Sequence, residues 1–451
     1  MKEKVFLIVG AGRSGIAAGK MLLSLNKTVV IYDGNTDLDT DEIKKKLETK
    51  EDILFLLGVV DENDFDGIDM CVVSPGVALD TPVMKAVIKK GIPVIGEIEL
   101  AYLYDKGSVV AITGTNGKTT TTSLTYEIIK SYNEKTLLVG NIEIPYTGLA
   151  LTSQPGGATV AEISSFQLET MKTFKPKVSA ILNITPDHLD RHKTMENYID
   201  IKKSIAKNQS EEDFCVLNYE DDVLRSFGET LGCRVVYFSS ENELSNGIFY
   251  KDGVIYIAEN GNVKEFCKVS ETNLVGVHNY ENIMAALAIT LSFGVPVDVI
   301  KEAVMKFTAV EHRIEFVCEK KGVKYYNDSK GTNTDAAIKA IDAMPATTVL
   351  IAGGYDKHSD YDEWVSHFHG KVRKLVLIGQ TKDNIAEACI KSGFRDFCFA
   401  ESLKEAVEIC AESAKEGDCC LLSPACASWG MFKSYQQRGN MFKELVADLE
   451  G

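Results

Sequence analysis

The chain has 451 residues, 45% of them hydrophobic and 25% charged, which is typical of a soluble globular protein of about three domains. Its 49 basic and 65 acidic residues give a formal net charge of −16, which argues against extended contact with nucleic acid or an anionic membrane surface. No apolar run approaches the roughly 18 residues of a membrane span, and eleven cysteines without a CxxC pair predict reduced core thiols in a cytoplasmic protein.

Short apolar segments alternate with helical segments along most of the chain, which predicts parallel sheets with crossover helices. We expect a hairpin at 247–258, where two strands flank Asp252 and Gly253, and a long helix at 278–294. The adjacent Cys419 and Cys420 suit strand side chains on opposite faces. The other predicted strands are 4–10, 28–33, 70–74, 92–96, 108–113, 136–140, 158–164, 178–184, 214–218, 234–240, 316–328, 347–354, 374–379 and 419–424.

These elements form three series, so we expect an α/β protein of three domains. Residues 1–96 are predicted to form an N-terminal Rossmann-like domain, and residues 97–309 a central domain with a P-loop ATPase-like parallel sheet. Residues 310–451 are predicted to form a second Rossmann-like domain. No linker rich in proline or serine marks the boundaries.

The first glycine turn is GAGRSG, at residues 10–15. It follows a strand and opens a helix, and Asp33 ends the next strand, as in a dinucleotide-binding fingerprint. Glycines allow close approach of a diphosphate to the unpaired N–H groups at the helix start. Taken alone, this turn is compatible with NAD, with another nucleotide, or with a purely structural turn.

A second glycine turn lies in the stretch GTNGKTT, residues 114–120. It resembles a phosphate-binding loop, but it is two residues shorter than the common G-x-x-x-x-G-K-[ST] pattern. Lys118 could reach terminal phosphates, and the Thr119 hydroxyl could bind Mg²⁺. The alternative is a helix that is simply capped by Thr115 or Asn116.

Further segments occur in order along the chain: AEISSFQLE, NITPDHLDRH, GVHNYENIMAA, EHRIEF, YNDSKGTN, IAGGYDK and LLSPACASWGMFKSYQQRGNMF. Together with GTNGKTT they closely resemble the Mur ligase family, whose own phosphate loop is the short form. The resemblance implies that ATP phosphorylates the carboxylate of UDP-N-acetylmuramoyl-L-alanine and that the amine of D-glutamate displaces phosphate. This would be a step of peptidoglycan precursor synthesis in the cytoplasm, carried out by a monomer.

The resemblance also assigns residues to ATP, metal and catalysis. It implies that Lys118 and His188 are catalytic and that Lys202 carries a carbamate formed with CO₂. Two Mg²⁺ ions are expected on Thr119, Glu162, His188 and Lys202. ATP is expected to meet Gly114, Thr115, Asn116, Gly117, Lys118, Thr119, Thr120, Asn279, Asn282, Arg313 and Asp328.

The resemblance also implies which residues bind the two remaining substrates. The UDP-linked substrate is expected at Arg13, Ser14, Asp33, Ser74, Gly76, Asn141 and Gln167. D-glutamate is expected at Lys330, Thr332, Lys357, Ser428, Trp429 and Tyr435. Two residues depart from the family pattern, because Glu143 stands where glycine is usual and Tyr435 where phenylalanine is usual.

Simpler interpretations of several residues remain open on the sequence alone. Lys202 would ordinarily be an exposed helix lysine, His188 a structural histidine, and Glu162 a strand-end carboxylate. Asn279 could cap a helix, and Trp429 could be buried at a strand end. Rival functions are another ligase of the same series, a folylpolyglutamate synthetase, an NAD dehydrogenase or a nucleotide switch.

Overall fold

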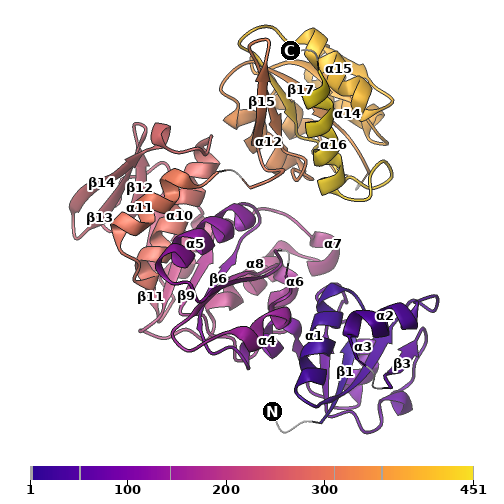
Figure 1. Ribbon diagram of the computed structural model, residues 1–451. Coiled ribbons are helices and arrows are strands. Elements are labelled where there is room, and N and C mark those ends of the chain that lie inside the picture. Colours follow the sequence, from indigo (N-terminus) through magenta and orange to yellow (C-terminus); the bar gives the residue numbers. More distant parts are fainter. Residues whose placement is uncertain (1–3, 50–51, 143, 309, 357–358, 450–451) are drawn as a thin grey trace. The chain divides into compact units, whose positions relative to one another are not determined.

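A computed structural model of the chain describes residues 4–49, 52–142, 144–308, 310–356 and 359–449. Glu143 and Lys357, singled out above, lie outside the described residues. The chain divides into two compact units, Met1–Cys267 with Asn282–Val304, and Lys268–Glu281 with Met305–Gly451. Three mostly parallel sheets with helices confirm the predicted α/β class (Figure 1). The division at residues 96 and 309 remains a prediction.

The first sheet is five-stranded, parallel and ordered β3-β2-β1-β4-β5. Side chains of α1 and α2 pack on one face of it, and side chains of α3 pack on the other. This is the doubly wound arrangement that the sequence predicts. The elements are β1 (Val5–Val9), α1 (Arg13–Ser24), β2 (Thr28–Asp33), α2 (Thr40–Leu47), β3 (Leu54–Leu57), β4 (Met70–Val73), α3 (Pro82–Lys89), β5 (Val94–Gly96) and α4 (Glu97–Tyr102).

The second sheet has nine strands in the order β14-β13-β12-β11-β10-β9-β6-β8-β7. Its elements are β6 (Ser108–Thr113), α5 (Lys118–Tyr132), β7 (Thr136–Gly140), β8 (Ala158–Glu162), α6 (Ser165–Leu168), β9 (Val178–Ile181), α7 (Leu189–His192), α8 (Met195–Lys203), β10 (Phe214–Asn218), α9 (Asp222–Gly228), β11 (Arg234–Ser239), β12 (Gly247–Lys251), β13 (Val254–Glu259), β14 (Asn262–Lys268), α10 (Val277–Phe293) and α11 (Val297–Lys306). The predicted hairpin is the antiparallel pair β12–β13, and the predicted long helix is α10.

The third sheet has the order β15-β16-β20-β17-β18-β19, and only the β15–β16 hairpin is antiparallel among the pairs described. Helices α12–α14 cover one face, and α15 and α16 cover the other. Cys419 and Cys420 lie in opposite layers, as predicted. The elements are β15 (Glu315–Lys320), β16 (Val323–Asn327), α12 (Thr334–Ala343), β17 (Thr348–Ala352), α13 (Asp362–Ser366), β18 (Val372–Leu377), α14 (Lys382–Ser392), β19 (Phe397–Phe399), α15 (Leu403–Ser413), β20 (Cys419–Leu422) and α16 (Tyr435–Asp448).

No helix within the described parts of the chain is both long and apolar enough to cross a bilayer.

The first glycine turn shows why a side chain is excluded at the start of α1. A Cβ atom on Gly15 would lie 1.9 Å from the carbonyl oxygen of Gly10, far inside van der Waals contact. Gly10 itself has φ +98°, a conformation that side chains disfavour. The turn therefore requires glycine for close backbone packing before any ligand is considered.

A buried carboxylate lies at the start of α4. The Thr147 N–H and hydroxyl, in the 3₁₀ helix η2 (Tyr146–Gly148), donate to Glu97 Oε1 at 2.5 and 2.7 Å. Glu97 Oε2 has no hydrogen-bond partner among the described residues. Burial raises the pKa of Glu97 to about 7, despite these two hydrogen bonds. Between about pH 4.5 and about pH 7, the Glu97 carboxyl is therefore largely protonated in the folded chain but largely ionised in the unfolded chain.

We expect Glu97→Gln to remove a pH dependence of stability. The pKa of Glu97 rises from 4.5 to about 7 on folding. The resulting contribution to the free energy of unfolding is therefore fully present below about pH 4.5 and is lost as the pH rises through 7. From about pH 5 to about pH 8, wild type should lose up to about 3 kcal/mol relative to the variant. Thermal midpoints measured across this range test it, and parallel curves for the two proteins would refute it.

Candidate active site

The candidate phosphate loop connects β6 to α5. Gly117 is the N-cap residue of α5 and has a left-handed φ of +83°. Neither Thr115 nor Asn116 occupies the N-cap position, so the alternative that one of them is the cap of α5 is wrong. A Cβ atom on Gly117 would lie 2.4 Å from Asn282 Oδ1, so glycine is required sterically as well as conformationally.

Asn183, which follows β9, holds the loop in its conformation. Its Oδ1 accepts from the Asn116 N–H at 2.8 Å, and its backbone carbonyl accepts from the Thr115 N–H at 3.0 Å. The Thr115 hydroxyl lies 3.1 Å from the Tyr198 hydroxyl and donates to the Thr185 carbonyl at 3.0 Å. Thr119 and Thr120 are buried at the start of α5. Asn183 and Tyr198 were not predicted, although Asn183 is the first residue of the quoted NITPDHLDRH segment.

Two lysines meet on one backbone carbonyl in this loop. Lys118 Nζ donates to the Gly114 and Thr115 carbonyls at 2.9 and 2.8 Å. Lys202 Nζ, from α8, donates to the same Gly114 carbonyl at 2.8 Å. The structure thus brings together two of the three predicted catalytic residues, and it concentrates positive charge beside the loop.

Lys202 is a buried residue, not the exposed helix lysine that the sequence alone favours. It is 1% exposed, and its Nζ lies 4.7 Å from the centre of the Tyr198 ring. Burial, and then the charge of Lys118, lower the pKa of Lys202 well below its ordinary value, against an opposing contribution from Asp187. The amine is therefore easier to deprotonate than that of a surface lysine. Its neighbour Lys203 instead lies over Phe227, 5.2 Å from the ring centre.

Glu162 ends β8 as a buried carboxylate, 2% exposed. Its Oε1 accepts from Asn141 Nδ2 at 2.8 Å, whereas its Oε2 has no hydrogen-bond partner among the described residues. A buried carboxylate oxygen without a partner is costly unless it binds a cation or a ligand. The predicted metal ligand Glu162 and the predicted substrate residue Asn141 are therefore in direct contact.

His188 occupies the turn before α7, with a left-handed φ of +52°. Its Nε2 lies 3.4 Å from Asp187 Oδ2, and its ring centre is 4.8 Å from that of Phe166. The side chain is about half exposed, so it is accessible to a ligand. This exposure favours a binding role over a histidine buried for packing.

The predicted Mg²⁺ site can be compared with these side chains. Among the described residues, no three His, Cys, Asp or Glu side chains are grouped so that they alone could hold a metal ion. Mg²⁺ commonly binds through one or two carboxylates, waters and substrate phosphates. The Glu162 oxygen, which lies beside the phosphate loop and is unpartnered within the described residues, fits that mode.

The two asparagines of α10 have different surroundings. Asn282 is buried, and its Oδ1 accepts from the Thr121 hydroxyl of α5 at 3.1 Å. Asn279 lies inside the helix, and its Nδ2 donates to the Val275 carbonyl at 2.8 Å. An N-cap side chain accepts a hydrogen bond at the residue before the helix, so the capping interpretation of Asn279 is wrong.

The residues predicted for the UDP substrate lie around the first glycine turn and at α6. Asp33 accepts from the Ala11 and Asn35 N–H groups, both at 2.9 Å, and thereby fixes the turn. The Ser74 hydroxyl donates to the Gly10 carbonyl at 3.0 Å, whereas Gly76 is exposed. Arg13 and Ser14 are the first residues of α1, and Gln167 accepts from the Ser164 N–H at 2.9 Å and helps to cap α6. The seventh predicted residue, Asn141, is in neither the turn nor α6 and contacts Glu162.

Four of the residues predicted for D-glutamate line one cavity of the C-terminal unit. Thr332, Ser428, Trp429 and Tyr435 surround a space of about 310 Å³, near the lower end of small-molecule pocket sizes. Trp429 is 56% exposed, so the interpretation of a buried tryptophan is wrong. Lys330 lies next to this set, with its Nζ 5.5 Å from the centre of the Tyr435 ring.

Asp328 and Arg438 organise the loops near this cavity. Asp328 follows β16, accepts from the Ser423 hydroxyl at 2.8 Å, and has its pKa raised to about 7 by burial. Arg438, which is fully buried, donates to the Ser329 carbonyl at 2.7 Å and to the Cys426 carbonyl at 3.2 Å. The predicted Arg313 lies before β15 and is partly buried. Arg438 was not predicted, although it stands in a quoted motif.

Comparison with known families adds independent findings. Residues 4–96 match the description "Mur ligase MurD-like, N-terminal domain", residues 112–290 "Mur ligase middle domain", and residues 312–426 "Mur ligase, glutamate ligase domain". These three matches cover most of the chain.

Two curated relatives carry the same name, UDP-N-acetylmuramoylalanine--D-glutamate ligase. The relative from Lachnospira eligens is 52% identical over 450 residues, which cover 100% of both chains. The relative from Thermoanaerobacter pseudethanolicus is 49% identical and covers 100% of this chain and 99% of its own.

Solved structures share the fold at low identity. UDP-N-acetylmuramate-alanine ligase MurC from Thermotoga maritima aligns with a TM-score of 0.63 and 16% identity, over 99% of this chain and 100% of its own. MurF ligase from the same organism, in complex with ADP, aligns with a TM-score of 0.62 and 18% identity, over 93% and 95%. The sequence motifs, the three sheets and these matches lead to one conclusion: this chain belongs to the Mur ligase family.

Proposed function

We propose that the chain is an ATP-dependent ligase that joins D-glutamate to UDP-N-acetylmuramoyl-L-alanine through an acyl phosphate, in the cytoplasm and as a monomer. The observation that carries the proposal is the meeting of Lys118 and Lys202 on the Gly114 carbonyl. The full-length likeness to D-glutamate ligases supports the choice of substrates.

Phosphorylation answers a chemical difficulty of amide formation. A carboxylate is a poor electrophile because its leaving group would be oxide, and transfer of the γ-phosphoryl group to it provides phosphate as a stable leaving group. Catalysis of such a transfer depends on positioning and on stabilisation of negative charge. Lys118, half-buried and directed into the loop, would hold the β- and γ-phosphates during this step.

Further residues are proposed for ATP from their motifs. In the phosphate loop, Gly114 and Gly117 would present backbone N–H groups to the phosphates. Thr115 and Asn116, whose N–H groups donate to Asn183, are proposed as neighbouring contacts from their place in the loop. Further contacts are proposed for Thr119, Thr120, Asn279, Asn282, Arg313 and Asp328.

Lys202 is proposed to act as a carbamate. A neutral amine can add CO₂, and the lowered pKa of this buried lysine favours the neutral amine. Glu162, Thr119, His188 and the carbamate would then provide oxygen and nitrogen ligands for two Mg²⁺ ions. When bound, these ions would neutralise phosphate oxygens and help to align the reacting groups.

The acceptor amino acid is proposed to bind in the cavity of about 310 Å³ in the C-terminal unit. D-glutamate has two carboxylates, and the hydroxyls of Thr332 and Ser428 and the nearby ammonium of Lys330 suit such groups. Lys357 is also proposed to bind D-glutamate, on the basis of its motif alone. The UDP substrate is proposed to bind at Arg13, Ser14, Asp33, Ser74, Gly76, Asn141 and Gln167.

An amino-acid panel tests the proposed reaction. With ATP, Mg²⁺ and UDP-N-acetylmuramoyl-L-alanine, we expect phosphate release to require D-glutamate, and L-glutamate, diaminopimelate and L-lysine to give less than about 1% of that rate. Omission of the UDP substrate is the control. Activity with a different amino acid would refute the D-glutamate assignment, and release without any amino acid would refute ligation.

Oxygen labelling tests the acyl phosphate. If the substrate carboxylate carries ¹⁸O, one labelled oxygen should appear in each phosphate released, because the bond between carbon and that oxygen breaks when the amine attacks. Mass spectrometry of the phosphate measures this transfer. Unlabelled phosphate from labelled substrate would contradict the mechanism.

The carbamate makes a prediction about Lys202 and its neighbour. We expect Lys202→Ala to lower kcat by about 10²- to 10³-fold, and a small carboxylate such as formate to restore part of it by occupying the vacated space. Lys203→Ala is the matched control, because Lys203 lies over Phe227 and not at the loop. Full activity of Lys202→Ala, or equal loss in both variants, would contradict the proposed role.

A further inference from the structure

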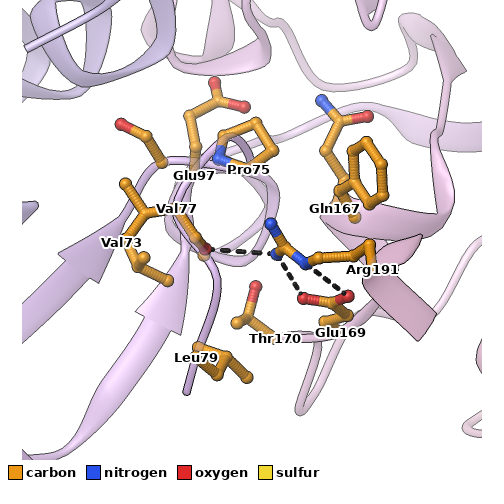
Figure 2. A pocket seen from close by; sticks show the side chains of 12 residues that line it. Val73, Pro75, Val77, Leu79, Glu97, Gln167, Glu169, Thr170 and Arg191 are labelled. Atoms are coloured by element: carbon orange, nitrogen blue, oxygen red, sulfur yellow. Dashed lines mark hydrogen bonds and ion pairs between the residues drawn. The ribbon is translucent and has the colours of Figure 1, made fainter. Parts of the chain in front are cut away.

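Arg191 of α7 connects two segments that carry candidate substrate residues. Its Nε and Nη2 donate to the two carboxylate oxygens of Glu169, just after α6, at 3.2 and 2.6 Å. Nη2 also donates to the Val77 carbonyl at 3.1 Å, in the loop that carries Ser74 and Gly76. Figure 2 shows the guanidinium between this carbonyl and the Glu169 carboxylate.

The surroundings of Arg191 hold it in one orientation. The Arg191 side chain is 15% exposed and that of Glu169 is 12% exposed, so solvent screens the pair only weakly. The guanidinium also lies 4.9 Å from the centre of the Phe166 ring. A planar fork that binds a carboxylate side-on, reaches a carbonyl and stacks on a ring is specific to arginine, and a lysine ammonium can reproduce only part of it.

The space next to Arg191 is too small for a substrate. The cavity lined by Ser74, Glu97, Gln167 and Arg191 has a volume of about 10 Å³ (Figure 2), which is room for one water molecule at most. Arg191 therefore acts through the groups that it holds and not as a ligand of the substrate.

Other hydrogen bonds hold the two segments that Arg191 connects. On α7, His192 Nε2 lies 2.9 Å from the Ser165 hydroxyl, and the His192 carbonyl accepts from Asn197 Nδ2 at 3.1 Å. On the other side, the Ser74 hydroxyl donates to the Gly10 carbonyl, within the N-terminal sheet. The bond from Arg191 to Val77 joins the loop of residues 74–77 to the α6–α7 segment.

We propose that Arg191 is a positioning residue that fixes the loop of residues 74–77 for binding of the diphosphate of the UDP substrate. The inference rests on the proposed function, which places the UDP substrate at Ser74 and Gly76, and it assigns this loop to the diphosphate part of that substrate. Without the hydrogen bond from Arg191 to the Val77 carbonyl, the loop must become ordered when the substrate binds. The entropy cost of this ordering lowers the affinity for the UDP substrate. The phosphate loop and the amino-acid cavity do not contain Arg191, so ATP and D-glutamate should bind as before.

Arg225 provides a matched control. Its guanidinium pairs with Asp222, donates to the Tyr219 carbonyl at 2.8 Å and lies 5.1 Å from the centre of the Tyr219 ring. These are the same three kinds of contact that Arg191 makes, but all of them lie within residues 219–225. Arg225→Met therefore reports the general cost of removing such an arginine.

The experiment measures the Kd of the UDP substrate by calorimetry, the KM of each substrate, and kcat, for wild type, Arg191→Met, Arg191→Lys and Arg225→Met in the full chain. We expect Arg191→Met to raise the Kd and KM of the UDP substrate about tenfold, with kcat and the other KM values within about threefold. Arg191→Lys should recover part of the loss, and Arg225→Met should change the UDP-substrate Kd less than twofold.

The outcomes separate this inference from the proposed function. If wild type binds the UDP substrate and makes product, but Arg191→Met matches Arg225→Met, the positioning role is refuted and the function stands. An equal rise in the KM for ATP, or a loss confined to kcat, would also refute it. If wild type does not bind the UDP substrate at all, both proposals fail.

Discussion

The Gly114 carbonyl is the acceptor on which the phosphate loop of this protein depends. Two ammonium groups, from Lys118 and from Lys202, donate to this one oxygen. Burial, and then the charge of the neighbouring Lys118, hold the pKa of Lys202 well below its ordinary value. The loop is consequently an environment that favours added negative charge, from phosphate oxygens or from a carbamate. Both glycines of the short turn have positive φ, +153° at Gly114 and +83° at Gly117, conformations that side chains disfavour.

The C-terminal unit uses the same physical principle with a different cation. Arg438 is completely buried, and carbonyls of two separate loops compensate its charge, at Ser329 and at Cys426. Burial lowers the pKa of Arg438 to about 10, so it remains protonated at neutral pH. Because the Ser329 loop precedes Thr332 and the Cys426 loop precedes Ser428, this one guanidinium fixes both sides of the cavity. A site whose supporting residues are themselves locked by hydrogen bonds needs little reorganisation when a ligand binds.

Much of the fold could be predicted from local patterns. Glycine turns after apolar strands predicted the β1–α1 and β6–α5 units, and alternating residues around Asp252 and Gly253 predicted the β12–β13 hairpin. The adjacent cysteines of β20 were correctly assigned to opposite faces. Two simpler interpretations that the sequence left open are wrong, because Lys202 is buried and Trp429 is exposed. Both interpretations applied the average behaviour of a residue type to residues whose surroundings are set by distant segments.

The sequence by itself determined the order of the elements, the α/β class, the family and the motif residues, because each of these is encoded in short stretches of chain. Only the tertiary structure decided that Lys202 lies against Gly114, 88 residues away, that one oxygen of Glu162 is left open, and that Arg438 and Arg191 join separate loops. These properties arise from desolvation and from contacts between distant segments. No periodicity or spacing in the chain specifies these contacts. The same motif surrounded by different residues would be buried to a different extent and would have different charges near it.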